Sequence, residues 1–237
     1  MTRLSVNINK IATLRNARGE DFPNLVKTAQ DIISFGAQGI TIHPRPDQRH
    51  IKYSDAYELK EKINTELNIE GNPNKKFLDL VNEVKPAQVT LVPDSDDAIT
   101  SNSGWDTINN FSFLNDIVKE FHSNSIRVSI FIDPEINMLK GAKKINADRV
   151  ELFTGPYAKE YNSNKSSAIN KYIQCAKVAD EISIDLNAGH DLNQYNLKFF
   201  IQSTKIIKEV SIGHALISES LYTGLESTIK SYLDILK

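Results

Sequence analysis

The chain has 237 residues, of which 40% are hydrophobic and 24% charged, as in an ordinary globular protein. Its 28 Lys and Arg residues nearly balance 30 Asp and Glu residues, which excludes a generally nucleic-acid-coating or polybasic membrane-binding protein. One cysteine, Cys175, excludes an internal disulfide. No apolar run approaches the ~18 residues of a membrane span, and the N-terminus has no leader-like apolar region. We therefore expect a soluble, cytoplasmic protein with one domain over residues 1–237.

Eight short runs rich in β-branched residues are predicted to be strands. They are Leu4–Ile8, Gly39–His43, Leu67–Glu70, Gln88–Val92, Ile126–Ile132, Arg149–Phe153, Ile182–Asn187 and Lys208–Ile212.

Apolar residues at helical spacing separate these runs and predict helices between the strands. The patterns are Leu25/Ala29/Ile32/Ile33, Phe77/Leu80/Val81/Val84 and Ile169/Ile173/Ala176/Ala179, and Leu221/Leu225/Ile229/Leu233/Leu236 predicts one closing helix. Eightfold strand–helix alternation favours an α/β fold, a single (β/α)₈ TIM barrel, over the alternative of a doubly wound sheet, whose Gly-rich dinucleotide turn is missing. Two long loops are expected, Pro93–Asp106, as a lid or an interface element, and the segment after Thr154 up to Lys165.

Barrel enzymes build their sites where the carboxyl ends of the strands meet, so the residues that follow each strand matter most. Four of the five histidines fall at or just beyond predicted strand ends, whereas His122 lies on a helix. The polar residues at these ends, in chain order, are Asn7, Asn9, Lys10, Arg15, Arg18, His43, Arg45, Arg49, His50, Glu70, Thr100, Glu151, Thr154, Asn187, His190, Gly213 and His214.

These residue types suit proton transfer and phosphate binding. Imidazoles and a carboxylate that face one cavity can exchange protons at pH 7. Arg18, Arg45, Arg49 and Lys10 offer cationic donors for phosphate. A glycine after the last strand, followed by a helix, matches the usual phosphate site of a barrel.

Each residue alone has a plainer explanation. A histidine at a strand end is more often structural, Arg45 and Arg49 fit solvated loop charges, and Glu151 fits a buried, paired carboxylate. Turn or backbone capping accounts for a lone asparagine. The coincidence of such residues on one rim of the barrel favours a site, because independent structural roles would not align there.

The residues leave a metal site open as an alternative, and they argue against a Schiff-base enzyme. His43, Glu70, Glu151 and His190 suit a divalent ion, as in barrel epimerases, although no HxH or HExxH pair supplies two ligands locally. A Schiff-base enzyme needs a lysine near the carboxyl end of a strand, and Lys208 lies at the beginning of its strand.

Eight strings, in order, carry a specific resemblance over essentially the whole chain. They are NINKIATLRNARG (7–19), ITIHPRPDQRHI (40–51), LNIEGN (67–72), VTLVPD (89–94), VSIFIDP (128–134), VELFTGPYA (150–158), NAGHDL (187–192) and IGHALI (212–217). With these strings the chain resembles the pyridoxine 5′-phosphate synthase family of vitamin B6 biosynthesis.

The resemblance implies a homo-octameric barrel that condenses 1-deoxy-D-xylulose 5-phosphate with 3-amino-2-oxopropyl phosphate and releases inorganic phosphate and water. This is transferase-class, ring-forming chemistry that needs no cofactor and no metal. His43 would act as the first base, Glu70 as the second proton acceptor and shuttle, and His190 as the acid, with Glu151 in support. Arg45, His50 and Thr100 would hold the deoxyxylulose phosphate; the aminoketone phosphate would be held by Asn7, Arg18, Gly213 and His214.

Five positions depart from the family pattern, and two of them, Pro44 and Pro46, should stiffen the loop around Arg45. Asn9 and Lys10 stand where the family has Asp and His, and Lys10 remains a donor for phosphate or hydroxyl. Asp191 stands where the family has Gly, and it places a carboxylate near a phosphate site while its backbone N–H stays available. These departures keep a non-enzymatic binding or assembly module open beside the metal-dependent epimerase, while the resemblance favours a synthase.

Overall fold

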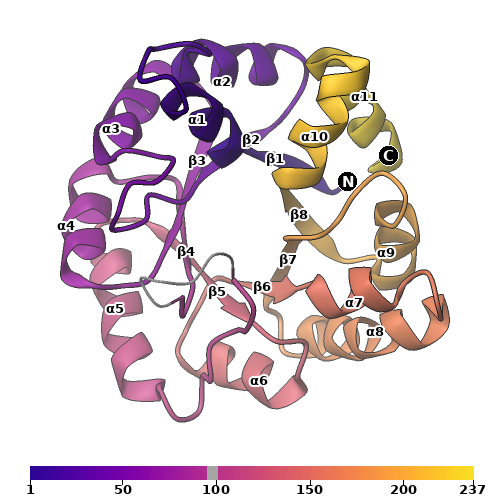
Figure 1. Ribbon diagram of the computed structural model, residues 1–237. Helices are drawn as coiled ribbons and strands as arrows, with labels where there is room; N and C mark the ends of the chain where they lie inside the picture. Colours follow the sequence, from indigo (N-terminus) through magenta and orange to yellow (C-terminus); the bar gives the residue numbers. More distant parts are fainter. Residues whose placement is uncertain (95–100) are drawn as a thin grey trace.

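The computed structural model describes residues 1–94 and 101–237, and its eight strands there close into a parallel barrel. Figure 1 looks into this barrel, with the strands at the centre and the helices around them. The strands are β1 (Arg3–Asn7), β2 (Gly39–Ile42), β3 (Glu66–Gly71), β4 (Gln88–Leu91), β5 (Arg127–Ile132), β6 (Arg149–Phe153), β7 (Asp185–Gly189) and β8 (Ile207–Ile212).

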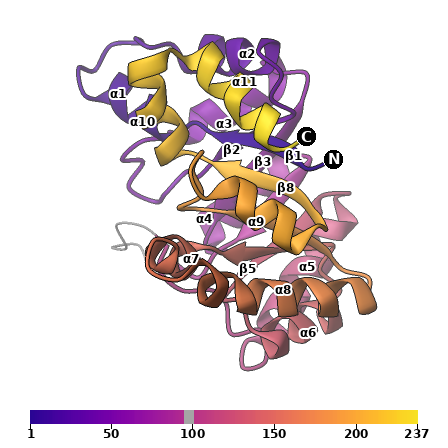
Figure 2. The ribbon, with the colours of Figure 1, turned by 90° about the vertical axis from the view of Figure 1, so that its right-hand side faces the viewer.

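Pairing of the first and last strands distinguishes a barrel from an open sheet. Each strand pairs with the next in chain order, and β8 pairs with β1 in the register Leu4↔Val210 and Val6↔Ile212. The predicted (β/α)₈ barrel is confirmed, and the doubly wound alternative is wrong. Figure 2 shows both chain termini at one end of the barrel, where β1 begins.

The helices form the outer layer of the molecule. They are α1 (Asn9–Asn16), α2 (Leu25–Ser34), α3 (Tyr53–Lys62), α4 (Lys75–Val84), α5 (Phe111–Ser123), α6 (Ile136–Lys144), α7 (Gly155–Glu160), α8 (Lys165–Glu181), α9 (Leu197–Thr204), α10 (His214–Thr223) and α11 (Leu225–Ile235). The predicted patterns become α2, α4 and α8, and each begins after an asparagine N-cap: the Asn24, Asn74 and Asn164 side chains each accept a backbone N–H three residues on. His122 lies on α5, as expected.

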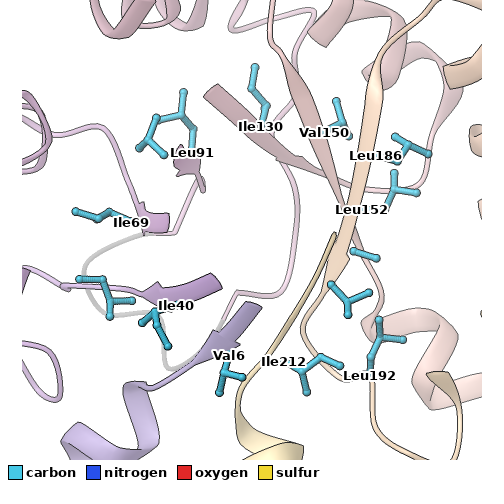
Figure 3. Close-up of a cluster of buried hydrophobic side chains, with 14 of the residues drawn as sticks. Val6, Ile40, Ile69, Leu91, Ile130, Val150, Leu152, Leu186, Leu192 and Ile212 are labelled. Atoms are coloured by element: carbon cyan, nitrogen blue, oxygen red, sulfur yellow. The ribbon is translucent and has the colours of Figure 1, made fainter. Parts of the chain in front are cut away.

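Alternation along the strands separates an apolar outer face from a polar inner face. Figure 3 shows the apolar set, to which every strand contributes. Inside the barrel, the Ser5 and Thr41 hydroxyls lie 2.7 Å apart, and Thr90 donates to Asn68 Oδ1 at 3.0 Å. Because these buried polar groups satisfy one another across strands, the barrel interior tolerates them.

Three expectations about element boundaries are wrong. The closing helix is two helices, because Gly224, with φ of 80°, interrupts the pattern, and Leu221 is exposed on α10. The expected loop after Thr154 begins with α7, whose Pro156 suits the first turn. The seventh strand starts later than predicted, because α8 continues to Glu181 and Ser183 turns the chain with φ of 54°.

Among the described residues, no helix is both long enough and apolar enough to cross a membrane.

Candidate active site

A cavity of about 640 Å³ opens where the carboxyl ends of the strands meet. Strands or strand ends from most of the barrel contribute to it, together with the beginnings of α1 and α10. Its lining consists of Asn7, Asn9, Lys10, His43, Arg45, His50, Glu70, Val92, Ser101, Phe131, Glu151, Ala158, His190, Asp191, Asn193, Ser211, Gly213, His214 and Ala215. The structure thus brings most of the polar residues at the strand ends to one cavity.

His43 directly follows β2, and its backbone is anchored to the neighbouring strand end. Its backbone N–H donates to Asn9 Oδ1 at 2.9 Å, and Asn9 N–H in turn donates to Asn7 Oδ1 at 3.0 Å. Burial, reinforced by the charge of Arg45, lowers the pKa of His43 well below its usual value. The imidazole is therefore neutral at pH 7, the state in which it can accept a proton.

His50 lies beside His43, with 6.4 Å between the two ring centroids. Burial and the nearby charges of Arg45 and Lys10 lower the pKa of His50 to about 4. Its Nδ1 accepts the Ile51 backbone N–H at 2.9 Å, so that Nε2 carries the proton of the neutral ring. His50 is thus suited to donate a neutral hydrogen bond from Nε2.

Two carboxyl groups, the half-buried Glu70 on β3 and the buried Glu151 on β6, face the same cavity. Burial raises the pKa of Glu70 to about 8, with the charges of Asp94 and Glu209 adding to the effect. Burial, and then the neighbouring Glu70, raises the pKa of Glu151 well above its usual value. A carboxyl group that titrates near neutrality can both donate and accept a proton.

Arg45 is held by a buried ion pair with Asp94, in which Nη2 and Oδ2 lie 2.7 Å apart. Only 5% of either side chain is exposed. Ser101 Oγ donates to the same carboxylate oxygen at 2.8 Å. A guanidinium held in this way keeps a fixed orientation, and a positive charge of fixed orientation at the cavity suits an anion.

A second anion-favouring place lies across the cavity, at the beginning of α10. Gly213 is the N-cap, and its neighbours His214 and Ala215 also line the cavity. A Cβ at Gly213 would lie 3.0 Å from the Asn7 Cβ, so the close approach of β1 leaves little room for a larger side chain here. Unpaired N–H groups at a helix start favour an anion, and Lys10 on α1 adds a positive charge.

Among residues 1–94 and 101–237, no three His, Cys, Asp or Glu side chains are grouped so that they could hold a metal ion.

A family model described as "Pyridoxal phosphate biosynthesis protein PdxJ" matches residues 4–237. The chain belongs to the PdxJ family. Among its PdxJ relatives, the pyridoxine 5′-phosphate synthase of Christiangramia forsetii is 57% identical and that of Cytophaga hutchinsonii 58% identical, each over 100% of both chains. The 3-keto-L-gulonate-6-phosphate decarboxylase of Vibrio cholerae has a TM-score of 0.66 and 9% identity, covering 99% of this chain and 97% of that one. That likeness shows the fold alone.

Among the described residues that were expected at the PdxJ site, Arg18 does not line the cavity. Arg18 is exposed in the turn after α1. Thr100 lies outside the described residues. Arg15, which also follows the first strand, forms a buried ion pair with Asp55 at 2.7 Å and thereby joins α1 to α3. Arg15 therefore has a structural role.

Sequence reasoning missed Asp94, Ser101, Asn193 and Ser211 of the PdxJ cavity or its supports. Ser211 was detectable, because it lies two residues after Glu209 on β8 and alternation turns both inward. The conformation of the chain after β4 brings Asp94 to Arg45, and no spacing rule predicts that pairing.

Proposed function

We propose that this chain is a pyridoxine 5′-phosphate synthase. In this reaction 1-deoxy-D-xylulose 5-phosphate and 3-amino-2-oxopropyl phosphate condense to pyridoxine 5′-phosphate, inorganic phosphate and water, which is transferase-class chemistry. The observation that carries the proposal is one cavity with a neutral imidazole, a carboxyl group of pKa about 8 and two separate anion-favouring places. Two phosphorylated substrates need two such places. The printed name of the full-length relatives supports the same reaction.

His43 acts first in this proposal. A base must remove a proton so that the amine of one substrate can attack the carbonyl carbon of the other and a carbon–carbon bond can follow. The neutral state of His43 suits this step at pH 7. The attacking amine comes from the substrate, so the reaction needs no enzyme lysine and no pyridoxal cofactor.

Glu70 then accepts and returns protons while water is lost and the ring closes. A pKa of about 8 lets one carboxyl group serve both steps near neutrality. His190 protonates the departing hydroxyl or phosphate, and the neutral carboxyl group of Glu151 supports this step as a hydrogen-bonding partner. Loss of water and phosphate leaves the closed ring aromatic without an oxidant. The steps of the reaction are therefore proton transfers rather than redox steps.

Arg45 and His50, together with Thr100, hold the deoxyxylulose phosphate in this proposal. Asn7, Gly213 and His214 hold the aminoketone phosphate, with Asn9, Lys10 and Arg18 as further donors. The position of Asp94 behind Arg45 supports the first pocket. The beginning of α10 supports the second.

The decisive experiment mixes chelator-treated protein with both phosphorylated substrates and follows product absorbance and released phosphate together. Equal amounts of pyridoxine 5′-phosphate and phosphate support the proposal and show that the reaction proceeds without a metal ion. Turnover of a single sugar phosphate that appears only when a metal ion is restored would replace the synthase with an epimerase or isomerase. Binding of deoxyxylulose phosphate without turnover would favour a binding module.

We further propose that the protein works as a homo-octamer, as its resemblance to the family implies. Large apolar side chains that remain exposed on the single chain, such as Phe22, Leu221 and Tyr222, support an assembled state. Light scattering during size-exclusion chromatography tests this: an octamer elutes at eight times the 26.7 kDa of one chain. A monomer at working concentration would contradict it.

A further inference from the structure

One of the two ring nitrogens of His190 lies against a carboxylate. Nδ1 is buried and lies 3.0 Å from Asp191 Oδ2, while 23% of the side chain remains exposed and His190 lines the cavity. Because Nδ1 lies against Asp191, Nε2 is the ring nitrogen that we assign to proton transfer. A histidine whose Nδ1 is bound by a carboxylate has its tautomer and ring orientation determined by that partner.

The backbone around this pair is held in an uncommon conformation. His190 has φ of 69°, in the left-handed region that non-glycine residues seldom adopt. The turn is closed by two hydrogen bonds: Leu192 N–H donates to His190 O at 2.8 Å, and Asn196 Nδ2 donates to Asp191 O at 3.2 Å. Because residues beyond β7 stabilise this turn, the two neighbouring side chains can meet instead of pointing apart.

Neighbouring elements hold the ring and the carboxylate from both sides. The Phe153 ring contacts His190 edge-on, with 5.3 Å between the centroids. On the other side, a Cβ at Gly155 would lie 3.3 Å from Asp191 Oδ2, so the beginning of α7 lies directly behind the carboxylate. The geometry leaves the Asp191 carboxylate directed at His190.

Asp191 is ionised at neutral pH. The contact with His190 Nδ1 is the main cause that lowers the pKa of Asp191, and it outweighs the opposing effect of burial. The charges of His190 and of His214 at the beginning of α10 act in the same direction. A fixed negative charge beside an imidazole favours the protonated ring.

The other charged groups around His190 come from several elements. Glu151 on β6 lies close below, since a Cβ at Gly189 would be 2.6 Å from its Oε1. The remaining titratable side chains that line the same cavity are Lys10 of α1, His43 and His50 after β2, Arg45, and Glu70 of β3. Glu70 and Glu151 have raised pKa values, and Asp191 is the carboxylate in contact with the ring.

We propose that Asp191 is a positioning residue that orients the His190 ring through Nδ1 and stabilises its protonated form, so that Nε2 presents a proton to the departing group. This inference rests on the proposed function for the identity of that group, but the pairing itself does not. Asp191 replaces the glycine of the family pattern, and at this position it acts through His190 rather than through a phosphate, which an ionised carboxylate would repel.

The test uses the whole protein with ring-labelled histidine and follows each imidazole by NMR as the pH is changed, with the His190 signal assigned from its loss in His190→Gln. In Asp191→Asn the midpoint of the His190 titration falls by about 0.5–1 pH unit, a size set by a carboxylate whose side chain is 55% exposed. Asp185→Asn is the matched control, because it removes one carboxylate at the opposite end of the same strand, where Asp185 pairs with Lys208 at 3.6 Å. An unchanged His190 midpoint in Asp191→Asn, or an equal fall in Asp185→Asn, overturns the proposal.

A second measurement connects the pair to the reaction. The alkaline limb of the kcat profile moves to lower pH in Asp191→Asn by the same amount, and Asp191→Glu recovers at least half of the shift. If the His190 midpoint moves in Asp191→Asn but the alkaline limb of kcat does not, Asp191 has only a structural role, and its proposed part in the reaction is overturned. If the wild-type protein forms no pyridoxine 5′-phosphate, the proposed function fails, yet the NMR titration still decides whether Asp191 controls His190.

Discussion

Burial shifts the pKa values of a base and an acid of the cavity, His43 and Glu70, in opposite directions. Burial makes both His43 and Glu70 neutral at pH 7, because it penalises the charged form of either type. Arg45 adds to this effect at His43, and Asp94 adds to it at Glu70. The site is thus prepared with a base that can accept a proton and an acid that can release one.

Removing either group should abolish most of the chemistry while leaving the fold intact. We expect His43→Gln and Glu70→Gln to lower kcat by ~10²–10⁴, the usual contribution of a positioned acid or base. Steady-state kinetics with both substrates measures this, and circular dichroism checks the fold. A loss of less than tenfold argues against the role of the residue that was changed.

The pH profile should report Glu70 directly. The carboxyl group accepts a proton only when ionised, and its pKa is about 8. We therefore expect the acid limb of kcat/KM of the wild-type protein to rise with pH up to about 8, whereas Glu70→Gln lacks this limb. A wild-type profile that is already level at about pH 6 would be inconsistent with this assignment.

Asp94 should act on substrate affinity through Arg45. In Asp94→Asn the guanidinium loses its charged partner, so we expect the KM for deoxyxylulose phosphate to rise about tenfold with a smaller change in kcat. The Glu70 limb should move to lower pH, because the charge of Asp94 helps to raise the pKa of Glu70. Ser101→Ala removes only the hydroxyl contact to Asp94 and should raise the KM less than threefold or so. Equal effects of both substitutions would show that the ion pair is not what matters.

At the scale of the elements, polar contacts join strands across the inside of the barrel. Glu66 on β3 pairs with Arg3 on β1, at 2.6 Å, and with Arg127 on β5. Arg127 Nε also donates to Gln88 Oε1 on β4 at 2.8 Å. This network lies at the amino ends of the strands, away from the cavity, so its role is to stabilise the barrel.

Removing the Glu66 charge should weaken the barrel in a pH-dependent way. Burial opposes ionisation, but the hydrogen bonds from Arg127 and Arg3 outweigh it and lower the pKa of Glu66. The stabilisation is therefore present above the pKa of the unfolded chain and is lost as pH falls through the lower folded value. We expect Glu66→Gln to reduce the free energy of unfolding by about 1–2 kcal/mol at pH 7 and by little in acid.

Urea unfolding at several pH values measures this effect, with Asp79→Asn as the control. Asp79 pairs with Lys75 on the exposed face of α4, and its loss should change stability by less than about 0.5 kcal/mol. If Glu66→Gln and Asp79→Asn behave alike, the interior network does not stabilise the barrel.

At the scale of the whole molecule, the last helix packs against one of the first. Gly36 follows α2 with φ of 113°, and a Cβ there would lie 2.8 Å from Leu233 Cδ1 on α11. This contact joins the two ends of the chain, which also meet where β8 pairs with β1. The barrel therefore closes where β8 pairs with β1, and the helical layer closes nearby, where α11 packs against the end of α2.

Gly36→Ala should lower the free energy of unfolding by about 2–3 kcal/mol, through backbone strain and the clash with Leu233 together. Gly19→Ala is the matched control, because Gly19 also has a positive φ, 73°, but open space around its Cβ position. Its cost should be about 1 kcal/mol, the backbone part alone. Equal losses in urea unfolding would mean that packing between α2 and α11 does not limit stability.

Local patterns predicted most of the fold correctly, and their failures have local causes. The strand ending in His43 and the helix over Phe77–Val84 were recognisable, because periods of two and of about 3.6 residues are properties of single elements. The break at Gly224 was missed, since the apolar spacing runs on across it. Arg18 was expected at the cavity because it follows the first strand, but the turn after α1 leaves it in solvent.

By itself the sequence determined the eight strand–helix repeats, the polar residues at the strand ends and the family resemblance. Each of these depends only on the order and spacing of residues within short segments of the chain. Only the tertiary structure decided that β8 pairs with β1, that Asp94 meets Arg45 and that Asp191 lies against His190. It also decided protonation: burial raises the pKa of Glu70 and lowers that of His43. The physical reason is that desolvation and Coulomb interactions depend on distance in space, which the folded chain alone defines.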